Sequence, residues 1–269
     1  MTVELSVLVP CFNVQAVIVG LVQALGTALP TFDAAVEVII VDDGSTDLTL
    51  ARARGLLTGR PWLRLLRVET REGKGNAISV GLRAARAPWV ALVEPDPRYA
   101  VDDVVTMWHR ARRGEADWFQ GRRTPPPTPR ADERFTRTIE RVLLSDPTTD
   151  PGCPIRMFRT SVAAKLPLQY RGLLRFLPVY AARLGYVIAE HPIGWTLGPA
   201  PAVEMSPVER TFGALVDVLA VRWMFARVGD PASVELRLPR PTPTPTAREE
   251  LAGPPPRATA TLPPRDPVS

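Results

Sequence analysis

Short apolar blocks alternate with longer segments of helical periodicity over the first 115 residues of the chain. The blocks are rich in Val, Ile and Leu at consecutive positions, which is typical of strands that are covered on both faces. The segments between them repeat apolar residues every three or four positions, which is typical of helices that pack on one side. The predicted strands are 5–10, 36–41, 63–68 and 89–93, and the predicted helices lie within 11–29 and at 48–57, 77–86 and 102–113. This alternation predicts a mostly parallel α/β sheet flanked by helices.

The second part of the chain has a less regular pattern and contains a proline-rich segment, 124–130, which we expect to form a lid-like loop. The predicted strands here are 118–119, 155–158 and 186–189, and the predicted helices are 135–144, 173–184 and 206–228. An apolar stripe on the last helix consists of Phe212, Leu215, Leu219 and Trp223. We expect this stripe to pack on the domain itself, with a membrane surface as the alternative.

Polar side chains also mark expected helix starts. Ser45 or Thr46 is predicted to cap the helix at 48–57, and Asp102 or Asp103 the helix at 102–113. The last segment, 239–269, has few large apolar side chains and many prolines, so it is predicted to be disordered.

The charge balance favours anionic partners. The 269-residue chain has 33 Lys and Arg against 28 Asp and Glu, a formal net charge of +5. Such an excess suits phosphates or anionic headgroups. No basic run is interleaved with aromatic residues, so nucleic acid is not an expected partner.

Cysteine usage and apolar run lengths bear on the cellular location. Cys11 and Cys153 are far apart and the chain has two His, so no structural zinc site is expected. The N-terminus shows no signal-like segment, and no apolar run is long enough to span a bilayer. We therefore expect a cytoplasmic protein.

Two carboxylates, Asp42 and Asp43, follow the strongly apolar strand predicted at 36–41. Ligands of open α/β sheets bind outside the carboxyl ends of the strands, so this pair marks a candidate site. The alternative is that both aspartates only form a turn with Gly44.

Several short motifs occur in one order between residues 4 and 195. They are VPCFN at 9–13, VDDGSTD at 41–47, GKGNAISVGLRAA at 73–85, VEPD at 93–96, GLLRFLP at 172–178 and YVIAEHPI at 186–193. Together they resemble the inverting nucleotide-sugar glycosyltransferases with the GT-A fold, specifically glycosyltransferase family 2 and its polyprenyl- and dolichyl-phosphate hexosyltransferase branch. The resemblance implies one GT-A domain at 1–200, with a nucleotide-binding half at 1–115 and an acceptor-side half at 116–200.

The resemblance implies roles for residues of the first half. It places Asp43, with Asp42 beside it, where it can accept a hydrogen bond from the nucleotide base. Pro10 and Phe12 are expected against the base or the ribose, and Lys74, in a flexible glycine turn, near a phosphate.

The resemblance also implies a metal site. Glu94 and Asp96 take the place of the family's DxD motif, so they are the expected ligands of Mg²⁺ or Mn²⁺. Arg98 departs from the family pattern. A cation at this position is expected to repel a divalent ion, or partly to replace it by pairing with the diphosphate.

On the acceptor side, the resemblance points to Arg122 and Arg123 as clamps for an acceptor or donor phosphate. Asp150 matches a family segment near the acceptor. It is the best candidate for a general base if the acceptor is a hydroxyl. Arg156 and Arg159 fit a site or a surface role equally well.

Two further departures concern the phosphates. Asn13 is followed by Val14 and Gln15 instead of two acidic residues, so an acidic contact to the nucleotide is expected to be missing. No Lys or Arg occurs between residues 184 and 209, which removes an expected cationic clamp.

The resulting expectation is a membrane-peripheral enzyme that moves a hexose from a nucleotide-diphosphate sugar to a polyprenyl phosphate. The alternatives are transfer to a hydroxyl of a glycolipid, polysaccharide or small molecule, and a degenerate relative that only binds. A phosphate acceptor needs no strong general base, because it is already anionic.

Overall fold

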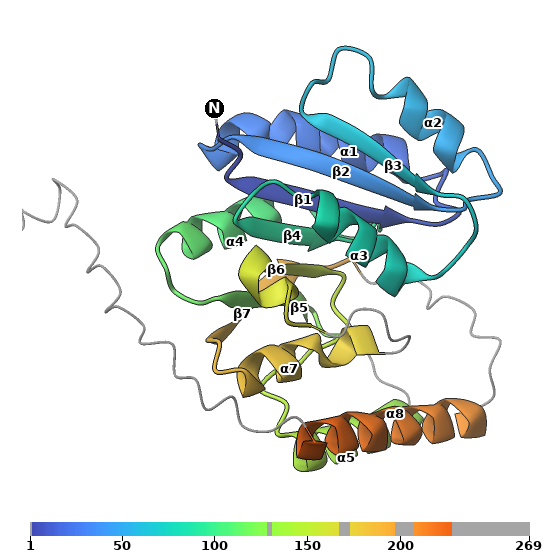
Figure 1. The fold of residues 1–269 in the computed structure, drawn as a ribbon, viewed down its shortest axis with the longest axis vertical. Coiled ribbons are helices and arrows are strands. Elements are labelled where there is room, and N and C mark those ends of the chain that lie inside the picture. The colour runs from blue at the N-terminus through green and yellow to red at the C-terminus, as the bar shows by residue number, and fades with distance from the viewer. Residues whose placement is uncertain (1, 128–130, 167–172, 197–206, 228–269) are drawn as a thin grey trace, which may run out of the picture. The chain divides into compact units, whose positions relative to one another are not determined.

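The computed structural model describes residues 2–127, 131–166, 173–196 and 207–227 (Figure 1). The segment predicted to be disordered, 239–269, lies outside these residues, as do the end of the proline-rich loop and the domain boundary predicted at residue 200. The division at residue 115 stays a prediction.

A seven-stranded sheet forms the centre of the fold, in the order β3-β2-β1-β4-β6-β5-β7. The strands are β1 (Leu5–Cys11), β2 (Val36–Asp43), β3 (Leu63–Val68), β4 (Trp89–Val93), β5 (Trp118–Thr124), β6 (Ile155–Arg159) and β7 (Ile188–Gly194). Only β6 runs against its neighbours β4 and β5, whereas all other pairs are parallel. The predicted fold class, a mostly parallel α/β sheet flanked by helices, is therefore confirmed.

Helices cover both faces of the sheet (Figure 1). One face packs on α1 (Ile18–Ala28), η1 (Leu29–Phe32), α2 (Thr49–Gly55) and α4 (Asp102–Arg112). The other packs on α3 (Lys74–Ala84), α6 (Thr160–Ala163), η2 (Leu173–Phe176) and α7 (Leu177–Arg183), with contributions from α5 (Ala131–Leu144) and α8 (Pro207–Arg227). Two apolar layers thus enclose strands whose side chains are buried on both sides.

Three elements differ from their predicted bounds in ways that affect the site. The strand β2 continues through Asp43, so both aspartates belong to the strand. The strand β5 continues to Thr124, and α3 begins at Lys74, which therefore lies in a helical turn and not in a flexible loop.

Both predicted sets of helix caps are wrong. The helix α2 begins at Thr49, whose backbone N–H donates to Asp47 at 2.9 Å, while the Ser45 hydroxyl accepts from the Asn13 backbone. The helix α4 begins at Asp102, so Asp102 and Asp103 lie within its first turn. Their carboxylates interact favourably with the helix dipole there.

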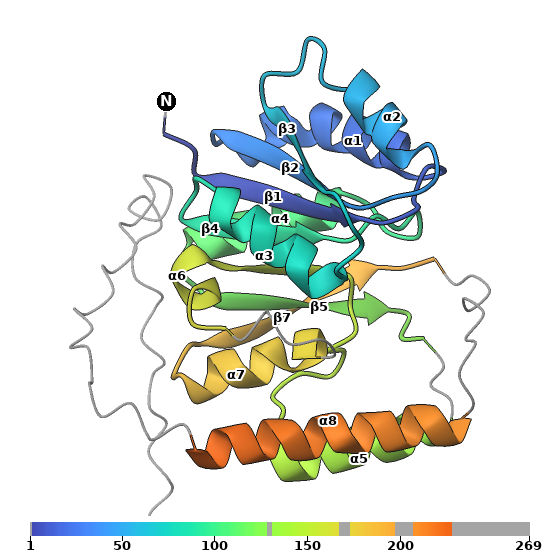
Figure 2. The same cartoon turned by 45° about the vertical axis from the view of Figure 1, so that its right-hand side comes forward.

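The orientation predicted for α8 is also wrong. Figure 2 shows α8 beside α5, at the edge of the molecule. The buried side chains of α8 are Ala214, Val218, Val221 and Phe225. Phe212, Leu219 and Trp223 of the predicted inner stripe are instead 68, 60 and 58% exposed. A helix that is apolar on opposite faces gives no periodic signal that selects the inner one.

Candidate active site

A cavity of about 310 Å³ lies where β1, β2 and β4 end. It is lined by Pro10, Cys11, Phe12, Val14, Asp43, Arg71, Gly73, Lys74, Ala77, Glu94, Pro95 and Asp96. All of the expected donor and metal residues except Asp42 line it. Asp42, Arg122, Arg123 and Asp150 lie outside this lining.

Asp43 is held in place by the backbone of the loop that precedes α3. Its carboxylate accepts hydrogen bonds from the N–H groups of Glu72 at 3.1 Å and Gly73 at 2.8 Å. The side chain is almost fully buried, yet it reaches the cavity wall. A carboxylate oxygen has two lone pairs, so Asp43 can still accept a hydrogen bond from a ligand.

Asp42, the residue before Asp43 in β2, faces the opposite side of the sheet and is completely buried. One of its oxygens accepts from the backbone N–H of Ser45 at 3.3 Å, and the other has no hydrogen-bond partner. Burial, and then the charge of Asp42, raises the pKa of the Cys11 thiol, so this cavity-lining thiol stays protonated.

Arg71 is a cavity residue that the sequence reasoning missed. Its guanidinium lies 4.0 Å from the centre of the Phe12 ring, in cation–π geometry. The backbone of Arg71 also passes close to the turn at Gly44. Only glycine leaves space for it there, because a Cβ at Gly44 would lie 2.8 Å from the backbone N of Arg71. The available signal was its position three residues before Lys74 in the glycine turn.

The N-terminus of α3 opens into the cavity through Gly73, Lys74 and Ala77. Gly73 has a φ of 102°, a conformation that favours glycine. The free N–H groups of a helix N-terminus attract anions, and Arg71 and Lys74 add positive charge beside it. This part of the cavity therefore suits a phosphate.

Glu94 and Asp96, the expected metal ligands, follow β4 and face the cavity. Lys74 Nζ lies 2.6 Å from Glu94 Oε2. Arg98 donates from Nε to Asp96 Oδ1 at 2.8 Å and from its terminal nitrogen to Oδ2 at 2.6 Å. Burial alone would raise the pKa of Asp96, but the hydrogen bonds from Arg98 outweigh it and hold that pKa below its usual range.

The chemistry of this pair fits Mg²⁺ or Mn²⁺, which prefer carboxylate and phosphate oxygens. Each carboxylate already holds a cationic group, so a divalent ion at this place competes with Lys74 and Arg98. Among the described residues, no third His, Cys, Asp or Glu converges on them, so other ligands would have to come from a bound substrate or water.

Trp195 joins this carboxylate pair to the acceptor side. The guanidinium of Arg98 lies over its ring at 4.4 Å and that of Arg123 at 5.3 Å. The backbone N–H of Trp195 donates to Thr124 at the end of β5. An aromatic ring thus bridges the two arginines in the segment that lacks the cationic clamp of the family pattern.

Arg123 and Asp150 form a two-pronged ion pair. Arg123 Nε donates to Asp150 Oδ2 and a terminal nitrogen of Arg123 donates to Oδ1, both at 2.7 Å. The backbone N–H of Arg123 also donates to Oδ2, at 3.1 Å. Arg122 is exposed and, by strand alternation, faces away from this cluster. The structure therefore brings Asp96, Arg123 and Asp150 together but not Arg122.

The sequence left a site role and a surface role open for Arg156 and Arg159 of β6, and both have partners within the protein. Arg156 is buried and donates to the carbonyls of Pro151 and Leu174, whereas Arg159 pairs with Asp117. Arg156 thereby fixes the backbone next to Asp150.

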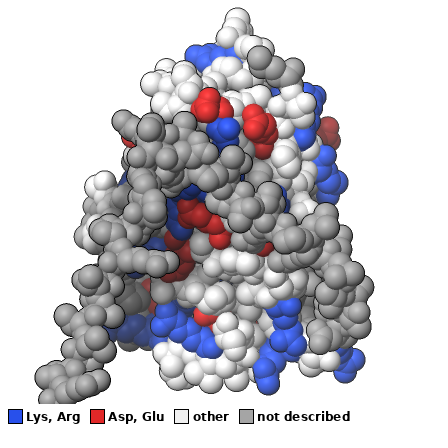
Figure 3. All heavy atoms as spheres, turned by 90° about the vertical axis from the view of Figure 1, so that its left-hand side faces the viewer, with Lys and Arg blue, Asp and Glu red and all other residues white. Residues whose placement is uncertain are grey.

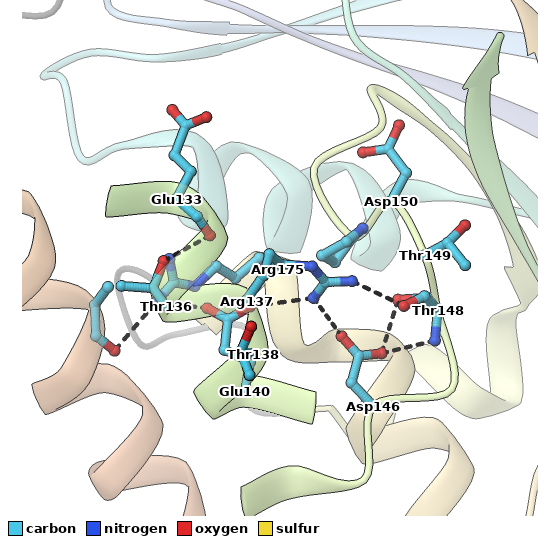
Figure 4. A network of polar contacts seen from close by, with 12 residues as sticks. Glu133, Thr136, Arg137, Thr138, Glu140, Asp146, Thr148, Thr149, Asp150 and Arg175 are labelled. Carbon is cyan, nitrogen blue, oxygen red and sulfur yellow. Dashed lines mark hydrogen bonds and ion pairs between the residues drawn. The ribbon is translucent and has the colours of Figure 1, made fainter. Parts of the chain in front are cut away.

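A polar network underlies the segment that carries Asp150 (Figure 4). Arg137 of α5 lies 2.8 Å from Asp146 and donates to the Thr148 carbonyl at 2.8 Å. It also contacts Glu140, which is paired in turn with Arg175 at 3.3 Å. Asp150 is therefore attached to a segment that α5 holds from below.

Comparison with protein families identifies the chain. Residues 6–166 match the model of glycosyl transferase family 2. The chain belongs to this family. Family 2 membership confirms the enzyme class that the sequence led us to expect, a nucleotide-sugar glycosyltransferase.

Two relatives have names that refer to lipid phosphates. The chain is 30% identical over 236 residues to a dodecaprenyl-phosphate galacturonate synthase of Rhizobium johnstonii, covering 82% of this chain and 67% of the relative. It is 23% identical to a dolichyl-phosphate beta-glucosyltransferase of Dictyostelium discoideum, covering 83 and 75%. The predicted resemblance to the polyprenyl- and dolichyl-phosphate branch of family 2 is thus confirmed.

Solved structures confirm the GT-A fold. Glucosyl-3-phosphoglycerate synthase of Mycobacterium tuberculosis superposes with a TM-score of 0.65 at 20% identity, covering 81% of each chain. A second structure of that enzyme contains Mn²⁺, uridine diphosphate and glucosyl-3-phosphoglycerate, with a TM-score of 0.64 at 21% identity over 82% of this chain and 80% of that one.

Proposed function

We propose that this family 2 glycosyltransferase moves a hexose from a nucleotide-diphosphate sugar to a polyprenyl phosphate. The observation that carries the proposal is the ion pair between Asp150 and Arg123, in which the guanidinium covers both carboxylate oxygens. A hydroxyl acceptor needs a base placed to take its proton, whereas both oxygens of Asp150 are occupied by hydrogen bonds from Arg123. A phosphate acceptor attacks through an oxygen that is already anionic, so no proton has to be removed.

In the proposed reaction, an oxygen of the acceptor phosphate attacks the anomeric carbon. The bond from that carbon to the donor diphosphate breaks, and the nucleoside diphosphate leaves with the electron pair. Arg123, paired with Asp150 but directed toward Trp195 and Asp96, is suited to orient the incoming phosphate. This reaction inverts the anomeric centre.

Donor binding is assigned to the cavity. Asp43 accepts a hydrogen bond from the base, Pro10 and Phe12 lie against the base or ribose, and Lys74 contacts the diphosphate. A Mg²⁺ or Mn²⁺ ion held by Glu94 and Asp96 would neutralise charge on the departing diphosphate. The nucleotide-diphosphate and metal content of the mycobacterial structures supports this assignment.

The outer face of α8 is proposed to lie on the cytoplasmic surface of a membrane. Apolar side chains gather on this face and on neighbouring α5, namely Val208, Phe212, Val216, Leu219 and Trp223 with Phe135 and Val142. Exposed arginines surround them, namely Arg134, Arg141, Arg222 and Arg227. In Figure 3 the lower end of the molecule shows mostly white atoms with clusters of blue.

Apolar and basic side chains on one helix surface suit an anionic lipid surface. The polyprenyl acceptor would be presented there. No helix among the described residues has the length and apolar character needed to cross a bilayer. Attachment by one face of α8 would therefore be peripheral.

The acceptor is tested with the full chain, a panel of radiolabelled nucleotide sugars, Mn²⁺ and undecaprenyl phosphate in detergent. We expect a lipid-linked sugar that mild acid releases. Asp150→Asn should keep transfer within about tenfold of wild type, because a general base accounts for about 10²–10⁴-fold and none is needed here. Transfer only to hydroxyl acceptors, with a loss of 100-fold or more in Asp150→Asn, would contradict the proposal.

The membrane surface is tested by sedimentation with phosphatidylglycerol vesicles and with phosphatidylcholine vesicles. We expect binding to the anionic vesicles and a loss of at least about tenfold in Leu219→Glu, because burial of a leucine side chain is replaced by an unfavourable charge. Leu48→Glu is the matched control, since Leu48 is 57% exposed on the donor side. Equal binding of both variants would exclude α8 as the contact.

A further inference from the structure

The turn after β4 neutralises each of its carboxylates with a cation of the chain itself. Glu94 has Lys74, and Asp96 has Arg98 on both oxygens. The Asp96 and Arg98 side chains are only 18 and 29% exposed, so water screens this pair incompletely. Asp96 lines the donor cavity at the expected metal position, and Arg98 approaches this carboxylate from outside the lining.

Arg98 is anchored in this position from several sides. Its backbone N–H donates to Asp96 Oδ1 at 3.0 Å, and its carbonyl accepts from the Thr196 N–H at 2.8 Å. Its guanidinium lies over the Trp195 ring at 4.4 Å. Arg98 therefore belongs to a constructed site and is not a surface side chain that reaches Asp96 by chance.

The charge of Arg98 opposes a second cation at Asp96. A divalent ion bound by this carboxylate would come within a few ångströms of the guanidinium, and like charges at such a distance repel strongly in a partly buried site. Both oxygens also direct lone pairs at Arg98 nitrogens. A metal ion that ligates Asp96 therefore has to overcome the repulsion of Arg98 or displace it.

We infer that Arg98 and a divalent cation compete for Asp96, so that Arg98 takes the place of the metal in the protein without donor. The inference deepens the proposed function, because it concerns the diphosphate end of the same donor cavity. It makes Arg98 a positioning residue: it holds Asp96 in place when no metal is bound and controls how tightly the ion binds.

A nucleotide diphosphate gives Arg98 a second partner. Its phosphate oxygens attract a guanidinium as strongly as a carboxylate does. With donor present, Arg98 can leave Asp96 for the phosphates while the ion takes its place. Metal binding should therefore be weak without nucleotide and stronger with it.

The competition is tested by titrating Mn²⁺ into the full chain, with free Mn²⁺ measured by electron paramagnetic resonance in the absence of nucleotide. We expect Arg98→Ala to bind Mn²⁺ at least about tenfold more tightly than wild type, and Arg98→Gln to behave alike. Adding Asp96→Asn to Arg98→Ala should remove the gain. Thermal unfolding of each variant checks that the fold is kept.

Arg159→Ala is the matched control. Arg159 also pairs with an aspartate, Asp117, and lies over a tryptophan, Trp89, at 4.6 Å, but its aspartate does not line the cavity. Loss of Arg159 removes the same charge and should leave Mn²⁺ affinity unchanged. Equal Mn²⁺ affinity of wild type and both Arg98 variants would overturn the inference, as would a gain that persists without Asp96.

A separate measurement distinguishes this inference from the proposed function. Calorimetry with a panel of nucleoside diphosphates in EDTA and in Mn²⁺ reports donor binding directly. If no nucleotide binds but Arg98→Ala still gains Mn²⁺ affinity, the donor assignment fails and the competition stands. If nucleotides bind and the gain is absent, the competition fails alone.

Discussion

The carboxylates at the two ends of the site are held by different kinds of partner. Asp43, at the nucleotide end, accepts hydrogen bonds from two backbone N–H groups, which are neutral. Asp96 and Asp150, at the phosphate and acceptor end, each hold a guanidinium on both oxygens. Neutral donors fix a carboxylate and leave its charge in place, whereas an arginine cancels it. The chain thus keeps negative charge where the proposed function places the nucleotide base and cancels it where that function places the phosphates.

Removal of Asp43 should have the largest effect on the nucleotide end. We expect Asp43→Ala to weaken binding of a nucleoside diphosphate by about 100-fold, or about 2.7 kcal/mol. The variant loses both the acceptor for the base and the anchor of the loop before α3. Isothermal titration calorimetry measures the affinity.

Asp33→Ala is the control for Asp43→Ala, because Asp33 is an exposed aspartate paired with Arg112 on the surface. It should bind the nucleotide as wild type does. A change of less than about threefold in Asp43→Ala would show that the base is recognised elsewhere.

Removal of Arg123 should affect the other end alone. We expect Arg123→Ala to lower kcat/KM for the lipid phosphate by about 10- to 30-fold, the lower part of the range for one charged hydrogen bond. Donor affinity should stay within about twofold, because Arg123 does not line the cavity. Steady-state transfer assays and calorimetry separate the two effects.

Arg122→Ala is the matched control on the same strand. Its side chain is exposed on the opposite face of β5, so its loss should change kcat/KM by less than about threefold. A larger loss in Arg122→Ala than in Arg123→Ala would mean that the acceptor phosphate binds on the other face.

The smallest expected effect concerns pH and the stability of the acceptor side. Burial, and then the charge of Arg110, lowers the pKa of His191 on β7 from 6.5 to about 4. Arg110 donates to its Nδ1 at 3.3 Å, which requires the neutral ring, and Glu115 lies near enough to oppose the shift weakly. The unfolded chain therefore binds a proton that the folded one does not.

The free energy of unfolding should then fall as the pH drops from 6.5 to about 4, by at most about 1.4 kcal/mol per pH unit from this residue. His191→Gln should flatten the dependence in this window, as measured by urea unfolding at several pH values. An unchanged slope in His191→Gln would assign the acid sensitivity to other groups.

Most of the sheet could be predicted from the sequence because its strands are apolar on both faces. The interiors of β1, β2, β3 and β4 lie within the predicted ranges. The ends of strands were harder, since Asp42, Asp43 and the arginines of β5 are polar residues in extended backbone. Their conformation comes from pairing with neighbouring strands, which a local pattern does not contain.

The site residues that lie within the recognised motifs could be predicted from the sequence. The motifs located Asp43, Lys74, Glu94 and Asp96 on one cavity, as the structure has them. They did not predict that Arg98 and Arg123 share the Trp195 ring, because the three residues come from distant segments. Nor did they predict which face of α8 is buried, because small and large apolar residues occur on opposite faces and only packing against α5 decides between them.

The network around Arg137 has a consequence for local opening of the chain. The segment from Asp146 to Asp150 has no regular backbone pairing, and such a segment ordinarily exchanges its amide protons quickly. Here the Thr148 amide donates to Asp146 at 2.9 Å, and Arg137 ties both residues to α5 (Figure 4). The segment should therefore exchange amide hydrogen together with α5, as one cooperative unit, while Asp150 at its end is also tied to β5 by Arg123.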